Sequence, residues 1–361
     1  MFYELVEPLR ALWSGFNVMR YITFRAAMAA VTAFAFSLWF YPRMIAWLTA
    51  IRLGESARGA EIPKLHALQQ HKTGTPTMGG LLIVGALVGS TGLWASWHEP
   101  VVWGAVIVTL ALAAVGWRDD YLKWTRRSGG LPARRKFAYQ LFVALVFAVW
   151  YASRPEVGTS LDVPFAKELV IELGWLIVPF VMLVIVGASN AVNLADGLDG
   201  LAIGCAVMIA VAYAGMSYVS GHQRFAEYLW IPFIPGSGEL AVFCAALIGA
   251  GMGFLWYNGH PASLFMGDTG SLALGGALAA VAVLIKKELL LAVVGGIFVV
   301  EALSVILQVA SFRLTGRRVF LMAPLHHHFQ LKGWPENKVT VRFWIIGAVL
   351  AMLSLSTLKL R

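Results

Sequence analysis

The stretch from residue 190 to 219, NAVNLADGLDGLAIGCAVMIAVAYAGMSYV, places four polar side chains directly before about 20 uncharged residues. An apolar run of that length is what one α-helix needs to cross a bilayer. The polar residues recur at every third position: Asn190, Asn193, Asp196 and Asp199. One helical turn would gather them on one broad face, and Gly197 and Gly200 allow close approach of a ligand. The stretch predicts a membrane helix that begins beside a polar site; a capped loop between two spans is the alternative.

The same alternation continues along all 361 residues, of which 59% are hydrophobic and 13% are charged. Soluble domains carry about twice that share of charged residues. We expect about ten spans, and no polar stretch is long enough for a separate soluble domain. The spans are expected near 25–45, 76–95, 100–118, 136–153, 168–188, 200–219, 238–256, 264–285, 288–311 and 340–358. The sequence thus predicts an all-α integral membrane protein, with residues 1–361 as a single polytopic domain.

The positions of Lys and Arg predict how the spans are oriented. Most of these 28 residues lie at Arg43 or in the first, third and ninth loops between spans. Cytoplasmic loops are enriched in Lys and Arg, so the odd-numbered loops are expected to be cytoplasmic and both termini periplasmic. The net charge of +9 is then explained by loop charges, and no nucleic-acid partner is expected. Cys205 and Cys244 fall inside apolar runs, which argues against a disulfide framework or a zinc site.

Five polar clusters lie in or beside the odd-numbered loops, and the even-numbered loops carry nothing comparable. The clusters are residues 71–77, Asp119-Asp120, residues 190–199, residues 267–269 and residues 326–328. Ionisable groups beside hydrocarbon are costly, so their grouping on one side indicates a function. The sequence therefore predicts an active site at the cytoplasmic face.

Each cluster also has a structural interpretation. Asp268 is suited to cap a helix N-terminus, and Asp119-Asp120 can be solvated charges at a helix end. Aspartate at a helix C-terminus opposes the helix dipole, so we expect a positive group near that pair. Lys72 can be an ordinary loop charge, because its surroundings match no phosphate-binding loop. Three consecutive His cannot all face one metal in a regular helix, which favours phosphate contact and packing.

Taken together, the clusters favour phosphoryl transfer. Neighbouring carboxylates repel one another and any anion unless a divalent cation is bound. Oxygen ligands favour Mg²⁺ or Mn²⁺ over zinc, and Mg²⁺ is typically held by one or two carboxylates plus substrate phosphates. Lys72 and the His run would neutralise the remaining phosphate charge. A site at the inner membrane face can take a soluble donor from one side and a lipid acceptor from the other.

Several motifs resemble the phospho-N-acetylmuramoyl-pentapeptide transferase (MraY) family, within the polyprenyl-phosphate N-acetylhexosamine-1-phosphate transferase superfamily. They are Lys72-x-Gly-Thr-Pro-Thr-Met-Gly-Gly, Asp119-Asp120-Tyr121, Asn193-Leu-Ala-Asp-Gly-Leu-Asp-Gly, Phe265-Met-Gly-Asp-Thr-Gly-Ser and Pro324-Leu-His-His-His-Phe. The resemblance covers nearly the whole chain, and the triple His marks the muramoyl branch. Gln330 is a departure, since an acidic residue is common there in the family.

The resemblance implies transfer of phospho-MurNAc-pentapeptide from UDP-MurNAc-pentapeptide to undecaprenyl phosphate. The products are lipid I and UMP, in the first membrane step of peptidoglycan synthesis. It implies a homodimer among the lipids of the bacterial inner membrane, with Mg²⁺ on Asp268. The implied catalytic residues are Asp119, Asp120, Asp268, Lys72, His327 and His328. The implied substrate-binding residues are Thr77, Asn190, Asn193, Asp196, Gly197, Leu198, Asp199, Asn258, Phe265, Gln308, His326 and Lys136, with Phe265 stacking on uracil.

Rival functions and mechanisms remain. Another branch of the superfamily would move GlcNAc-1-phosphate to the same lipid, although the His run argues against it. A cation-coupled transporter would carry polar groups near the membrane midplane and often internal repeats, and the sequence indicates neither. The transfer itself can proceed by direct attack of the lipid phosphate or through a covalent phospho-sugar on an aspartate. We favour direct attack, because the lipid phosphate is largely ionised at neutral pH.

Overall fold

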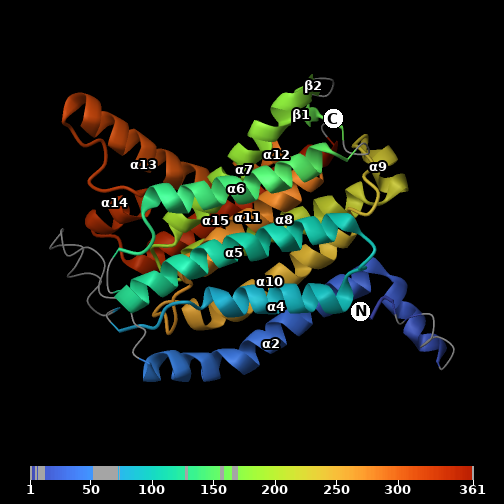
Figure 1. Cartoon of the computed structure of the whole chain (residues 1–361), viewed down its shortest axis with the longest axis horizontal. Coiled ribbons are helices and arrows are strands. Elements are labelled where there is room, and N and C mark those ends of the chain that lie inside the picture. The colour runs from blue at the N-terminus through green and yellow to red at the C-terminus, as the bar shows by residue number, and fades with distance from the viewer. Residues whose placement is uncertain are drawn as a thin grey trace.

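The computed structural model describes residues 2–4, 6, 13–51, 72, 74–126, 129–154, 158–164 and 170–359. Long helices run side by side along one axis and make up most of this part of the chain (Figure 1). Eight of the described helices have the length and composition to cross a membrane. The prediction of an all-α integral membrane protein is confirmed.

Helices stand at all ten positions where the sequence predicts spans. The eight spanning segments are α2 (Ile22–Ala50), α5 (Pro100–Arg126), η3 with α7 (Gly174–Ala195), α8 (Leu201–Ser220), α10 (Glu239–Asn258), α11 (Gly267–Leu284), α13 (Gly296–Thr315) and α15 with η4 (Glu336–Lys359). Two further helices, α4 (Gly80–Trp94) and α6 (Ala133–Ala152), fill the remaining positions. Helix α4 has only 15 residues, and α6 begins with a basic turn.

One expected span is interrupted. The apolar run 288–311 contains two helices, α12 (Glu288–Val294) and α13, which meet at Gly295 and Gly296. Helix α13 leans away from the other helices (Figure 1), and few of its residues are buried. Hydropathy alone predicts one continuous span here, because two glycines do not lower the apolar content of the run.

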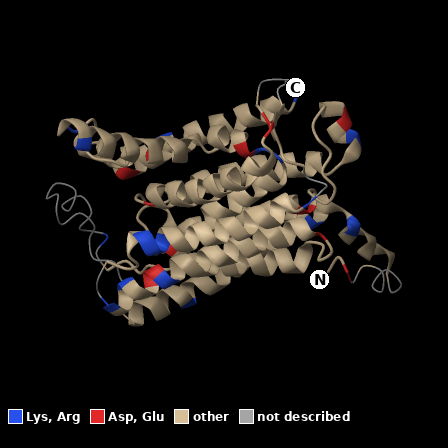
Figure 2. Cartoon of the chain, turned by 45° about the horizontal axis from the view of Figure 1, so that its top comes forward, with Lys and Arg blue, Asp and Glu red and all other residues tan. Residues whose placement is uncertain are grey.

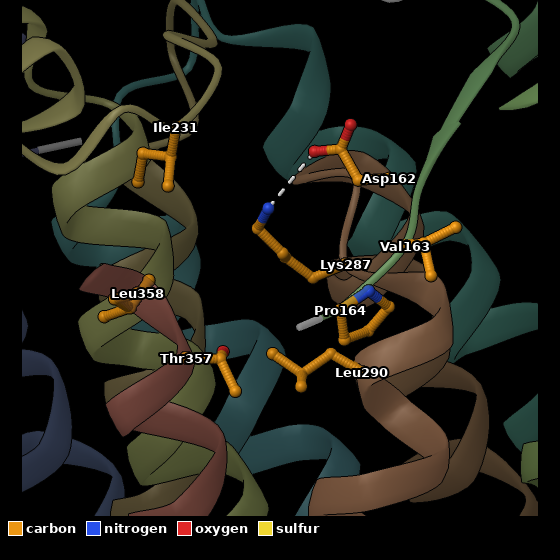
Figure 3. A pocket seen from close by; sticks show the side chains of 8 residues that line it. All are labelled: Asp162, Val163, Pro164, Ile231, Lys287, Leu290, Thr357 and Leu358. Atoms are coloured by element: carbon orange, nitrogen blue, oxygen red, sulfur yellow. Dashed lines mark hydrogen bonds and ion pairs between the residues drawn. The ribbon is translucent and has the colours of Figure 1, made fainter. Parts of the chain in front are cut away.

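The two ends of the helix bundle differ. Both termini lie at one end, together with η1 (Ser14–Arg20), α9 (Gln223–Leu229) and the antiparallel strands β1 (Ser160–Asp162) and β2 (Val170–Glu172). A small pocket at this end contains an ion pair between Asp162 and Lys287, with Nζ 3.2 Å from Oδ2 (Figure 3). The short helix α14 (Leu325–Leu331) lies at the opposite end, where charged residues also gather between the helices (Figure 2).

Helix α11 forms the centre of the bundle, and all of its residues are buried. It packs against α4, α5, α7 and α8. Glycine permits the closest of these approaches: a Cβ on Gly116 of α5 would lie 2.2 Å from the carbonyl oxygen of Asp268. The end of α5 thereby reaches the N-terminus of α11, which brings two of the predicted polar clusters into contact.

Gly116→Ala should therefore destabilise the protein by about 1–3 kcal/mol and slow turnover, because the new methyl group meets backbone atoms that cannot rotate away. The thermal unfolding temperature and the initial rate in detergent measure the two effects. Gly85→Ala is the matched control, since no atom lies within 4 Å of a Cβ added to that α4 residue. Unchanged stability and rate in Gly116→Ala would contradict the close contact of α5 with α11.

Candidate active site

Three carboxylates meet where α5 reaches the N-terminus of α11. Asp119, Asp120 and Asp268 each have an oxygen within 4.8 Å of the others, and all three side chains are buried. The turn before Asp268 depends on Gly267, whose φ of 73° is a conformation that glycine adopts readily. Three hard oxygen ligands at this spacing could hold a divalent cation such as Mg²⁺.

Asp120 is engaged with the N-terminus of α11. Its Oδ1 accepts a hydrogen bond from the backbone N–H of Asp268 at 3.1 Å. Its Oδ2 accepts from both the backbone N–H of Thr269, at 2.9 Å, and the hydroxyl of that residue, at 2.7 Å. Asp120 therefore satisfies N–H groups that a helix leaves unpaired at its start. The carboxylate of Asp268, which the sequence suggests as this cap, is left for other partners.

Two lysines bring positive charge to the other two carboxylates. Lys123 Nζ lies 2.8 Å from Oδ2 of both Asp119 and Asp268. Lys136 Nζ lies 2.6 Å from the same Asp268 oxygen and 3.4 Å from Asp119. The expected positive group beside Asp119-Asp120 is thus present. The resemblance implies Lys136. Lys123 was not predicted as a site residue, although it follows Asp119 at the i,i+4 spacing that brings helical charges together.

Asn193 fixes the remaining oxygen of Asp268. Its side-chain amide donates to Asp268 Oδ1 at 2.8 Å and lies at the same distance from the Ser271 hydroxyl. Helix α7 thereby joins α5 and α11 around one carboxylate. Three clusters that are far apart in sequence form a single site.

A pocket of about 460 Å³ opens beside these groups. It is lined by Asp119, Lys123, Gly129, Leu131, Ala133, Lys136, Asn193, Asp196 and Asp268. The backbone N–H of Leu131 donates to Asp119 Oδ1 at 2.6 Å, which holds that carboxylate at the wall. Asp120 does not line the pocket. The lining of carboxylates and ammonium groups suits a ligand with phosphate groups and a bound cation.

Lys72 lies in a second polar cluster with Asp199 and Glu336, the Lys72 cluster. Its Nζ is 2.7 Å from Asp199 Oδ1, 2.5 Å from Glu336 Oε1 and 5.8 Å from the centre of the Phe265 ring. Glu336 was not among the residues predicted from the sequence. Its position in the first turn of α15, after Pro335, gave no sign that it would meet the Lys72 motif.

Asp199 is held on both sides of its carboxylate. Besides Lys72, it meets the backbone N–H of Ala262 at 3.1 Å and His260 Nδ1 at 3.0 Å. Burial acts to raise the pKa of Asp199, but the charge of Lys72 and the hydrogen bonds from Lys72, Ala262 and His260 together lower it. The carboxylate therefore stays ionised at neutral pH.

Three more of the predicted substrate-binding residues, Asn258, Phe265 and Thr77, contact the loops around this cluster. Asn258 accepts from the backbone N–H of Gly200 at 3.0 Å and donates to the carbonyl oxygen of Leu264 at 2.8 Å. Phe265 pairs with the Lys72 motif, since its backbone N–H donates to the carbonyl oxygen of Pro76 at 2.8 Å. Thr77 lies beside Gly267, with Oγ1 3.2 Å from the position of an added Cβ. His71 and Thr73 of the same cluster lie outside the described residues.

The triple His occupies α14 with three different environments. His326 is fully buried, with Nδ1 3.2 Å from Glu301 Oε2 and its backbone N–H donating to Glu301. It lies directly against Gly197, where an added Cβ would come within 2.3 Å of Nε2. His327 Nδ1 lies 2.9 Å from Gln330 Oε1, the position at which the sequence departs from the family.

His328 is neutral at neutral pH. Burial and the charge of Lys332 lower the pKa of His328. Its Nδ1 accepts from the backbone N–H of Leu321 at 3.1 Å, so the ring proton lies on Nε2, where it can be donated to a ligand.

Three other predicted residues make contacts within the protein. Asn190 donates to Gln140 Oε1 and to the carbonyl oxygen of Val186, both at 2.8 Å. Gln308 accepts from the backbone N–H of Phe320 at 2.9 Å and so holds the loop before α14. Leu198, the neighbour of Asp199 in sequence, is buried.

Comparison with known families agrees with this geometry. The model of "Glycosyl transferase family 4" matches residues 102–286, about half of the chain, and the match includes all three clustered carboxylates. The "Phospho-N-acetylmuramoyl-pentapeptide-transferase signature 1" matches residues 72–84, which begin at Lys72. The resemblance found in the sequence is confirmed. The chain therefore belongs to glycosyl transferase family 4, among the polyprenyl-phosphate hexosamine-1-phosphate transferases, and carries the signature of their phospho-N-acetylmuramoyl-pentapeptide branch.

Proposed function

We propose that the protein transfers phospho-MurNAc-pentapeptide from UDP-MurNAc-pentapeptide to undecaprenyl phosphate, giving lipid I and UMP. One observation carries the proposal. The signature residue Lys72 precedes α4, and the buried carboxylates Asp119 and Asp268 stand where α5 ends and α11 begins, so all three belong to the end of the membrane bundle where α14 lies (Figure 1). A soluble donor and a lipid acceptor can meet only at such an end. In this proposal that end faces the cytoplasm of a bacterial inner membrane, both termini are periplasmic, and residues 1–361 are one domain of a homodimer.

Mg²⁺ is the cofactor in this proposal, with Asp268 as its main protein ligand. The chemistry of the site fits a hard cation, because Asp268 and its neighbours Asp119 and Asp120 bring carboxylate oxygens within 4.8 Å of one another. When bound, Mg²⁺ neutralises and polarises phosphoryl oxygens. Asp119 is close enough to Asp268 to act as a second metal ligand, whereas Asp120 bonds α11 through both of its oxygens.

The residues of the chain provide position and charge, which is most of what phosphoryl transfer requires of a protein. Lys123 and Lys136 neutralise the charge that develops on the transferred phosphate. Asp119, held by the backbone N–H of Leu131, orients the acceptor phosphate and takes up any proton that it still carries. Transfer is then a direct attack that forms the bond from lipid phosphate to donor phosphorus and releases UMP.

The two ends of the donor lie in different clusters. The uridine end lies against residues 197–199 and Phe265, near Lys72. The sugar and its peptide lie toward α14, where they approach the Nε2–H of His328 and the ring of His327. His326 is fully buried, so its role is to support Gly197 by packing against it.

The decisive test is release of UMP by purified protein in detergent with undecaprenyl phosphate, with and without Mg²⁺. Turnover is expected with UDP-MurNAc-pentapeptide and only in the presence of the metal. UDP-GlcNAc is the matched alternative donor. Transfer of GlcNAc-1-phosphate in its place would assign the protein to the other branch, and the absence of turnover with either donor would refute a transferase.

Lys72→Ala should raise the KM for the nucleotide donor by about tenfold, the usual effect of losing one charged hydrogen bond. The KM for the lipid acceptor should change much less, because Lys72 is paired with Asp199 and does not line the pocket beside Asp268. Steady-state kinetics with each substrate varied in turn measure both values. Arg43→Gln, an exposed basic residue whose guanidinium bonds within α2, is the control. A selective rise in the lipid KM would reverse the assignment.

A further inference from the structure

Glu336 joins two parts of the Lys72 cluster through one oxygen. Its Oε1 accepts from Lys72 Nζ at 2.5 Å and from the backbone N–H of Asp199 at 2.7 Å. The side chain is only 7% exposed, so water competes little with these bonds. Glu336 stands in the first turn of α15, where the positive end of the helix dipole favours a carboxylate.

Two more residues on the same face of α15 hold the same turn. Thr340 Oγ1 donates to the carbonyl oxygen of Asp199 at 3.3 Å, and Trp344 Nε1 donates to that of Gly200 at 3.2 Å. Positions 336, 340 and 344 are four residues apart and therefore lie along one stripe of the helix. Of these three residues, Glu336 also bonds the charged side chain of Lys72. It connects the position of α15 with the position of the Lys72 ammonium group.

The charges of the cluster indicate which part of a ligand it can receive. Asp199 and Glu336 share one lysine, so the three groups together carry an excess negative charge. A phosphate would be repelled there, whereas the N–H groups of an uncharged heterocycle would be attracted. The ammonium group lies 5.8 Å from the centre of the Phe265 ring, which offers a flat face to such a heterocycle. The cluster thus suits a base, and the diphosphate belongs beside Lys123 and Lys136.

We infer that Glu336 is a positioning residue for the nucleoside end of the donor, acting through Lys72 and the backbone of Asp199. This inference rests on the proposed function, because it presumes a uridine nucleotide as the donor. Glu336 fixes the ammonium group beside Phe265 and keeps the Asp199 turn against α15. Its removal should weaken every ligand that carries the nucleoside, whatever the number of phosphates.

The test compares Glu336→Gln with Glu336→Ala. Glutamine still accepts from the Asp199 N–H but no longer provides a charge for Lys72, whereas alanine removes both contacts. Dissociation constants for uridine, UMP and UDP, obtained by competition, should rise by a similar factor of about ten for glutamine, and more for alanine. The donor KM should rise in step, while kcat and the lipid KM stay within about threefold. Asn337→Ala, an exposed neighbour on α15, should behave as wild type.

Three results would overturn the inference. Weaker binding of UDP with unchanged binding of uridine would show that Glu336 acts on the phosphates and not on the nucleoside. A lower kcat with an unchanged donor KM would place its effect on the chemical step. A fall in unfolding temperature, together with equal losses in nucleoside affinity, donor KM, lipid KM and kcat, would show that Glu336 only stabilises the fold. The wild-type protein separates this inference from the proposed reaction. If it binds uridine nucleotides but does not transfer phospho-MurNAc-pentapeptide, the proposed reaction is refuted and the binding comparison stays valid. If it does not bind uridine nucleotides at all, the proposed reaction and the role of Glu336 are both refuted.

Discussion

Asp268→Asn is expected to reduce UMP release by about a thousandfold while the protein still folds. The physical reason is the loss of a buried carboxylate that lines the pocket, lies beside the carboxylate of Asp119 and is not needed to cap a helix. Asparagine keeps the shape of the side chain but removes the negative charge that a divalent cation requires. The fold should survive, because Asp120 holds the N-terminus of α11 through backbone N–H groups that the substitution leaves in place.

Radiolabelled donor with chromatographic detection of UMP measures the rate, and differential scanning fluorimetry measures folding. The Mg²⁺ concentration for half-maximal rate should also rise in any residual activity. Asp162→Asn is the matched control, since this carboxylate is also paired with a lysine (Figure 3) but belongs to β1, at the opposite end of the bundle (Figure 1). Wild-type turnover in Asp268→Asn would remove the metal from this residue.

Asp119→Asn and Asp120→Asn should fail in different ways, although the residues are neighbours in sequence. Asp119→Asn is expected to lower kcat by about 10²–10³-fold with little change in unfolding temperature, because the carboxylate lines the pocket and faces two lysines. Asp120→Asn should destabilise the protein by about 1–3 kcal/mol, because an NH₂ group would then face N–H donors of α11 in a buried place.

The comparison needs unfolding temperature and kcat for both variants, with glutamate substitutions as a second pair that retain the charge. Residual activity in Asp120→Asn should recover when the protein is stabilised by lipid or by lower temperature, whereas that of Asp119→Asn should not. The opposite pattern, an unstable Asp119 variant and a stable but inactive Asp120 variant, would exchange the two roles.

The positions of the helices follow from local composition. An apolar run near residues 200–219 predicts α8 within one residue at each end, because hydrocarbon thickness sets the length of a span whatever its neighbours are. Charge distribution likewise predicted that the polar clusters share one end of the bundle. Two boundaries were not predicted. Helix α5 continues through charged residues past the expected boundary at 118 to Arg126, because a helix can extend beyond the apolar run, and the span 288–311 is divided at Gly295.

The sequence by itself determined the membrane class, the number of expected helix positions, the grouping of the polar clusters and the motifs of the family, because each is a property of a short segment. Only the tertiary structure decided which carboxylate lines the pocket and which one bonds the N-terminus of α11. Asp119 and Asp120 point about 100° apart on one helix, and the packing of α5 on α11 turns one toward the pocket and the other toward an N-terminus. The partners Lys123 and Glu336 were likewise decided by packing, since a hydrogen bond depends on distance in space and the sequence places Glu336 264 residues from Lys72.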